Sequence, residues 1–132
     1  MEPSRKVSEF LDSAKVYYLA TVESNQPRVC PYGAQMLYDG KLYVMAFYHS
    51  NATRQLEENP KAELCAFHGE TLRVECELVE DKRPEIKEAL LNKYPELKSA
   101  LGEHAENAVM YEAKNVTATF YKFMEELESY KF

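Results

Sequence analysis

The chain carries QPRVCPYGA at residues 26–34, YDGKLY at residues 38–43 and RQLEENPKAEL at residues 54–64. In the second stretch, Asp39 and Gly40 lie between apolar runs and suit a tight hairpin turn whose two central residues take positive φ angles. In the third stretch, Pro60 ends a short helix, because the residue before a proline avoids the helical region. The three stretches therefore predict a hairpin, a short helix and a further strand, in that order.

Apolar periodicity and turn residues predict the elements around these stretches. An amphipathic helix is expected over residues 7–14, a helix capped by Ser50 reaches Asn59, and prolines 84 and 95 begin a long helical crossover that ends at Gly102. The acidic residues 125–128 are expected as a solvated tail. The strands are expected at residues 17–22, 29–38, 41–48, 62–68, 71–80, 108–113 and 116–123. Seven mostly antiparallel strands are best closed into a small barrel, because closure removes unpaired edges.

Length and composition restrict the class of protein. At 132 residues with 45% apolar residues, the chain is expected to form a single domain over residues 1–132. We find no apolar run of the length that a signal peptide or a membrane span needs, so we expect a cytoplasmic protein with no membrane association. Asp and Glu outnumber Lys and Arg by 22 to 16 and the basic residues are scattered, which argues against nucleic-acid binding.

The cysteines and histidines do not form a disulfide or metal pattern. Cys65 and Cys76 are expected on opposite arms of one hairpin but about three residues out of register, roughly 10 Å apart and too far to bridge. Cys30 is interpreted as a small buried hydrophobe. The three histidines are far apart in the sequence, so no metal site is expected.

The three quoted stretches, in their order and spacing, resemble the pyridoxamine 5'-phosphate oxidase-like family, and most of all its short members related to nitroimidazole-resistance proteins. Residues 72–79 resemble the next strand of the family and residues 108–123 its last two, so the similarity covers nearly the whole chain. This resemblance implies a mainly β fold with flanking helices, the FMN-binding split β-barrel of six to seven antiparallel strands. It also implies a homodimer with one FMN in each of two clefts at the subunit interface.

The same resemblance implies the cofactor-binding residues, which fall on the second and third strands and the turn into the short helix. In this chain they are Arg28, Val29, Cys30, Pro31, Tyr32, Met45, Ala46, Phe47, His49, Ser50, Asn51 and Arg54.

This chain departs from the family at the phosphate-binding positions. The family often has arginine at the position of Cys30 and a basic residue near Ser50, Asn51 and Ala52, and all of these are absent here. Backbone amides at the helix start suit a phosphate without a lysine. His49, Arg54, Arg28 and Arg73 are the candidate replacements for the missing cations.

Two functions therefore remain open from the sequence. The first is an FMN-binding flavoprotein, a flavin-dependent oxidoreductase or electron carrier acting on a small molecule, in which the flavin supplies the chemistry and no side chain need act as acid or base. The second is a non-catalytic ligand-binding or sensing split-barrel dimer that has lost or weakened FMN binding and takes haem or another flavin. The missing cations favour the second function.

Overall fold

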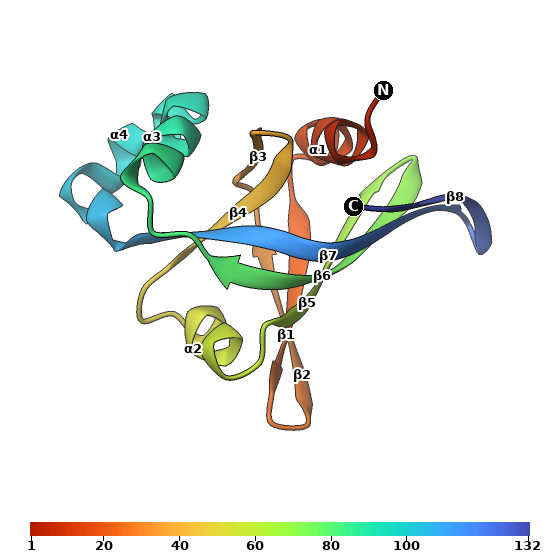
Figure 1. Ribbon diagram of the computed structural model, residues 1–132, viewed down its shortest axis with the longest axis horizontal. Helices are drawn as coiled ribbons and strands as arrows, with labels where there is room; N and C mark the ends of the chain where they lie inside the picture. Colours follow the sequence, from red (N-terminus) through yellow and green to blue (C-terminus); the bar gives the residue numbers. More distant parts are fainter.

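The computed structural model describes residues 1–132 as one antiparallel sheet with helices packed around it (Figure 1). The helices are α1 (Pro3–Ala14), α2 (Asn51–Glu58), α3 (Pro84–Lys93) and α4 (Pro95–Leu101), and a 3₁₀ helix, η1 (Gly102–Asn107), follows α4. The eight strands are β1 (Tyr17–Glu23), β2 (Gln26–Tyr32), β3 (Gln35–Tyr38), β4 (Lys41–Phe47), β5 (Lys61–His68), β6 (Glu70–Glu80), β7 (Ala108–Lys122) and β8 (Glu125–Lys131).

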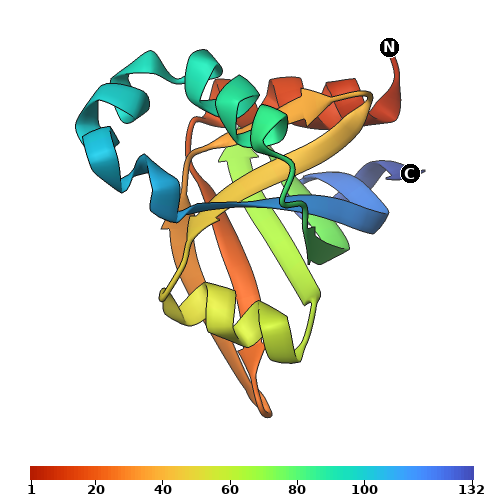
Figure 2. The ribbon, with the colours of Figure 1, turned by 60° about the vertical axis from the view of Figure 1, so that its left-hand side comes forward.

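The sheet confirms the expected fold class, a mainly β split barrel with flanking helices, but it is not closed. Its strand order is β2-β1-β5-β6-β7-β4-β3, and β8 pairs with β7 beside β4. The end strands β2 and β3 do not pair with each other, so the expectation of a fully closed barrel is wrong. Helix α1 packs against β3, β4 and β5, beside the end strand β3 (Figure 2).

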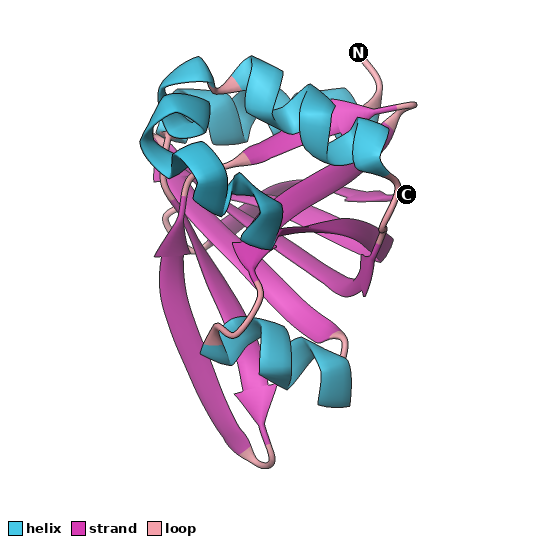
Figure 3. Cartoon of the chain, turned by 90° about the vertical axis from the view of Figure 1, so that its left-hand side faces the viewer, coloured by secondary structure: helices cyan, strands magenta, loops and turns pink.

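Two apolar clusters hold the sheet and the helices together. The larger cluster fills the concave side of the curled sheet, where Val7 and Leu11 of α1 and Leu56 of α2 pack on the strands. In the smaller cluster, Ile86 and Leu90 of α3 pack on β3, β4 and β7. As a result α2 lies by itself at one end of the molecule and α1, α3 and α4 lie at the other (Figure 3).

The local turn and cap predictions are confirmed at two positions. Asp39 and Gly40 have φ angles of 51° and 74°, and Tyr38 pairs with Lys41 across the turn. Ser50 is the N-cap of α2.

The predicted strand over residues 29–38 is wrong, because the chain leaves one edge of the sheet after Tyr32 and joins the opposite edge at Gln35. Gly33 and Ala34 make this crossing. A Cβ at Gly33 would lie 3.3 Å from the carbonyl oxygen of Lys15, so the close approach there favours glycine.

The predicted pair of strands at 108–113 and 116–123 is a single strand, β7. Asn115 has a φ of 52°, and the pairing with β6 shifts register between Glu75 and Glu77. Asn115 and Val116 therefore form a β-bulge opposite Cys76 inside a long strand, and the expected turn near residues 114–115 is absent.

Residues 125–128 are solvated as predicted, but they do not form a tail, because they begin strand β8, which folds back on β7. Its carboxylates are exposed, and Tyr130 packs on the large cluster. A strand that is solvated on nearly its whole length carries no apolar alternation, so its sequence does not show the usual signal.

Candidate functional site

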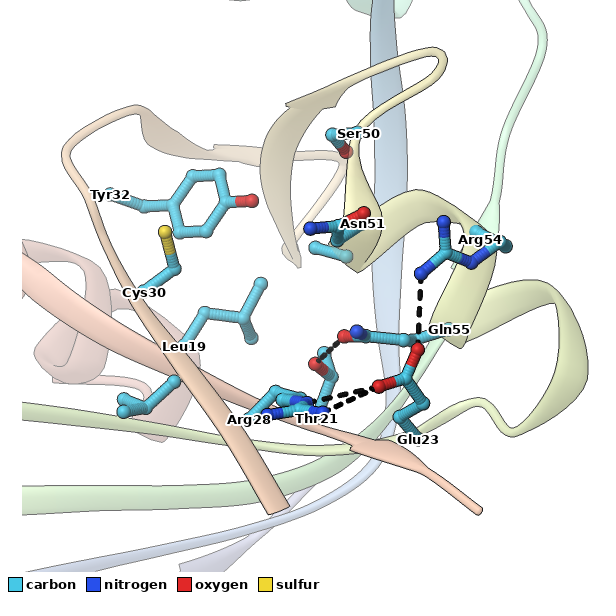
Figure 4. Close-up of a pocket in the computed structure, with 12 residues that line it drawn as sticks. Leu19, Thr21, Glu23, Arg28, Cys30, Tyr32, Ser50, Asn51, Arg54 and Gln55 are labelled. Carbon is cyan, nitrogen blue, oxygen red and sulfur yellow. Dashed lines mark hydrogen bonds and ion pairs between the residues drawn. The ribbon is translucent and has the colours of Figure 1, made fainter. Parts of the chain in front are cut away.

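A cavity of about 360 Å³ opens between the β1–β2 hairpin and the first turn of α2 (Figure 4). The residues that line it come from β1, β2 and α2 and its cap: Leu19, Thr21, Glu23, Arg28, Val29, Cys30, Tyr32, Ser50, Asn51, Ala52, Arg54 and Gln55.

Strand pairing explains which side chains of the hairpin reach the cavity. Thr21 pairs with Arg28 and Leu19 pairs with Cys30 in the antiparallel register of β1 and β2. Because alternate residues of a strand face the same side, Arg28, Cys30 and Tyr32 share one face of β2. The β2 residues on that face lie beside the Leu19 and Thr21 side chains of β1.

The other wall is the start of α2, which is fixed by side-chain hydrogen bonds. The backbone amide of Thr53 donates to the Ser50 hydroxyl at 3.2 Å, and the Thr53 hydroxyl donates to the Phe47 carbonyl at 2.6 Å. The first amides of a helix have no acceptor within it, and those of Asn51 and Ala52 are in this position. They lie on the cavity wall with the positive end of the helix dipole, which suits an anion.

Both arginines of the cavity are paired with one carboxylate, Glu23. Arg28 donates to Glu23 Oε1 from Nη2 at 2.7 Å and from Nε at 3.1 Å, and Arg54 Nη2 donates to Oε2 at 3.1 Å. The hydrogen bonds from Arg28, followed by its charge and the bond from Arg54, lower the pKa of Glu23. The side chains are partly exposed, so the cluster is accessible to a ligand from solvent.

A buried polar pair ties α2 to β1 behind this ion cluster. The hydroxyl of Thr21 donates to Oε1 of Gln55, and both residues are almost fully buried. Near the other end of the cavity, burial raises the pKa of Tyr32, with a smaller effect from Cys30 and Tyr111. The cavity thus has a charged end at Glu23 and a more apolar end at Leu19 and Tyr32.

The structure brings seven of the twelve sequence-predicted site residues together on this cavity: Arg28, Val29, Cys30, Tyr32, Ser50, Asn51 and Arg54. His49 lies in an adjoining hollow that shares Ser50 and Arg54 with the cavity.

Four predicted residues lie elsewhere. Met45 is buried in the smaller apolar cluster and Ala46 in the larger one. Phe47 packs against the smaller cluster, and Pro31 is exposed on β2. Arg73, a candidate replacement cation, lies outside the cavity with its guanidinium 5.7 Å from the centre of the Tyr121 ring.

The interpretation of Cys30 as a buried hydrophobe is wrong, because its side chain is exposed on the cavity face of β2. Strand β2 is an edge strand without a neighbour on its outer side, which leaves this position open. All three cysteines are free, and Cys65 and Cys76 stand three residues out of register, as predicted.

Sequence reasoning missed Leu19, Thr21, Glu23 and Gln55 as lining residues. The short polar stretch between the first two strands contains the signal for the first three, because the tight turn between Glu23 and Gln26 fixes the register that places them beside Arg28 and Cys30. Gln55 has no such signal, because its inward orientation depends on how α2 packs.

No helix of the structure has the length and apolar character needed to cross a membrane.

The comparisons with family models and with solved structures agree on one family. The family model described as Pyridoxamine 5'-phosphate oxidase matches residues 4–120. A NimC/NimA family protein from Clostridium acetobutylicum is 32% identical, with a TM-score of 0.90 over 98% of this chain and 92% of that chain. No curated protein matches the sequence.

Two more distant structures share the fold. General Stress Protein 26 from Bacillus anthracis strain Sterne is 17% identical, with a TM-score of 0.75 over the whole of both chains. A FAD-binding protein from Mesorhizobium loti is 16% identical, with a TM-score of 0.59 over 89% of this chain and 94% of that chain.

Proposed function

This chain belongs to the pyridoxamine 5'-phosphate oxidase family, and we propose that it is an FMN-binding flavoprotein that works as a flavin-dependent oxidoreductase or electron carrier on a small molecule. The observation that carries the proposal is the cavity that joins two arginines to the free amides at the start of α2. Its volume lies within the range of about 300 to 1,000 Å³ that is usual for small-molecule sites. The neighbour from Mesorhizobium loti is named as a FAD-binding protein, so a flavin suits this fold.

The donor set of the cavity fits a phosphorylated flavin. The amides of Asn51 and Ala52 suit the phosphate, and Arg28 and Arg54 supply charged donors beside them. At the far end, the side chains of Leu19 and Tyr32 provide apolar surface for the ring system or the chain of the ligand.

The residues of the chain hold and shield the flavin in this proposal. When bound, the flavin supplies the electron-transfer chemistry. The Ser50 cap and the buried Thr21–Gln55 pair keep the two walls of the cavity at a fixed separation. Such a rigid support holds a ligand in one orientation, which electron transfer to a small molecule requires.

We propose further that the protein is a homodimer in which a second copy covers the cavity. Every residue of β2 except Tyr32 is exposed, and the side chains of Val29 and Tyr18 are 70% and 51% exposed. Covering an apolar strand edge of this kind usually requires an interface of about 2,000 Å² or more in an obligate dimer. The cavity opens at the same edge, so a second copy there would exclude water from the ligand.

A second candidate function is a non-catalytic ligand-binding or sensing dimer that takes haem or another flavin in the same cavity. The pairing of both arginines with Glu23 favours it, because this pairing weakens the attraction for a phosphate. The absorption spectrum of the protein as purified distinguishes a bound flavin from a bound haem.

Titration with FMN, followed by quenching of flavin fluorescence, tests the proposed function. We expect saturable binding, and we expect Arg54→Gln to weaken it about tenfold, the usual effect of losing one charged hydrogen bond. Arg5→Gln is the matched control, because Arg5 is exposed on α1 and lies outside the cavity. If the natural protein does not bind FMN, or if the two variants weaken binding equally, the proposed site is refuted.

A further inference from the structure

Glu23 is the one carboxylate among the residues that line the cavity. It is the last residue of β1, directly before the hairpin turn, where Ser24 has a φ of 56°. One oxygen of Glu23 accepts from Arg28 and the other accepts from Arg54. A single acidic side chain therefore accepts hydrogen bonds from both cavity arginines.

The net charge of this cluster is small. Two guanidinium groups and one carboxylate leave a net charge of +1, although the arginines alone would give +2. The hydrogen bonds from Arg28 and Arg54 lower the pKa of Glu23, so the carboxylate stays ionised at neutral and mildly acidic pH. A terminal phosphate, which carries nearly two negative charges at neutral pH, would enter beside this carboxylate.

Two effects oppose such a phosphate. It must compete with Glu23 for the donors of the same two arginines, and it is repelled by the negative charge that stays on the cavity wall. A flavin whose side chain ends in a hydroxyl group meets neither effect. The cluster thus changes the affinity for a charged ligand group, and it leaves the apolar end of the cavity at Leu19 and Tyr32 unchanged.

We infer that Glu23 is a specificity-determining residue of this cavity, which it makes nearly indifferent to whether a flavin side chain ends in phosphate or in a hydroxyl group. The ligand class is then flavins in general, including riboflavin, and not FMN alone. This inference rests on the proposed flavin-binding function.

If Glu23 instead has a positioning role, neutralising it should change the affinity for FMN in the opposite direction. If the carboxylate mainly holds the two arginines ready for a phosphate, its loss frees their side chains and weakens FMN binding. The direction of the change on neutralising Glu23 therefore separates specificity from positioning.

The test measures dissociation constants for FMN and riboflavin by fluorescence quenching with the natural protein and with Glu23→Gln. We expect the variant to bind FMN about three- to tenfold more tightly, the usual size of one partly screened charge acting on a dianion, and to bind riboflavin within twofold of the natural value. Glu58→Gln is the control, because it changes net charge equally from an exposed position at the far end of α2. Glu23→Asp keeps the charge and should keep the natural preference.

Each result of this experiment either supports or overturns the inference. A ratio of FMN to riboflavin affinity that rises in Glu23→Gln and stays constant in Glu58→Gln and Glu23→Asp supports the inference. An unchanged or falling ratio in Glu23→Gln, with flavin still bound, overturns the inference and leaves the proposed function standing. If the natural protein binds neither flavin, the proposed function falls and this inference falls with it.

Discussion

Replacing Ser50 probes the cap of α2 and the candidate phosphate site together. Ser50→Ala removes the acceptor of the Thr53 amide, and loss of an N-cap usually costs about 1 kcal/mol of stability. For a chain of this length, that corresponds to a fall of roughly 3 to 5 °C in melting temperature. Because the frayed turn carries Asn51 and Arg54, we also expect weaker binding of FMN.

Ser50→Asp separates the cap from the charge. Aspartate caps helices as well as serine does and its carboxylate interacts favourably with the helix dipole, so the melting temperature should stay within about 1 °C of the natural value. The added negative charge lies beside the amides of Asn51 and Ala52, so FMN binding should weaken while riboflavin binding changes little.

Calorimetry gives the melting temperatures, and fluorescence titration gives the two affinities. Ser13→Ala is the control, since the Ser13 hydroxyl bonds to Glu9 within α1 on an exposed surface. If Ser50→Asp binds FMN as tightly as the natural protein, the phosphate does not lie at the start of α2 and this reasoning is refuted.

Three further predictions concern the cavity, the pH dependence and the assembly. Cys30→Arg should tighten FMN binding by about one order of magnitude and leave riboflavin unchanged in the same titration, because Cys30 is exposed on the cavity face two residues from Arg28; equal effects on both flavins would contradict it. Burial, followed by the hydrogen bond to Asp81, raises the pKa of Tyr43 to about 12 from the ordinary 10, so the stability that its neutral hydroxyl provides should be complete below pH 10 and lost as pH rises towards 12. Urea unfolding across that range should show this loss in the natural protein and a smaller one in Tyr43→Phe; equal slopes would count against it. Sedimentation should show a dimer of the 15.3 kDa chain, and a stable monomer at micromolar concentration would contradict the proposal that a second copy covers the cavity.

Local signals predicted the fold where they were strong, and they failed where the deciding contacts lie far apart in the sequence. Asp39 and Gly40 specify their turn by φ preference alone. Ser50 specifies its cap by a hydrogen bond from the amide of Thr53, which is only three residues away in the sequence. By contrast, Asn115 looks like a turn residue but lies in a bulge, because β6 pairs with β7 on both sides of it, from Tyr111 to Tyr121. The strand β8 lacks an apolar pattern and is stabilised by its pairing with β7.

The candidate site follows the same division. The residues of the QPRVCPYGA stretch and the helix cap could be predicted through the family resemblance, and seven of the predicted residues line the cavity. The role of Glu23 could not, since it depends on a bond to Arg54 across 31 residues. Cys30 was assigned to the core because free cysteine is usually buried, and the edge position of β2 overrides that preference.

The central claim is that the cavity between the β1–β2 hairpin and α2 binds a flavin, and a crystal structure of the protein grown with FMN tests it most directly. We predict one flavin per chain, with its phosphate within hydrogen-bonding distance of the amides of Asn51 and Ala52 and its remaining atoms against Leu19 and Tyr32. A flavin bound elsewhere on the chain, or a cavity that stays empty at saturating FMN, would contradict the claim.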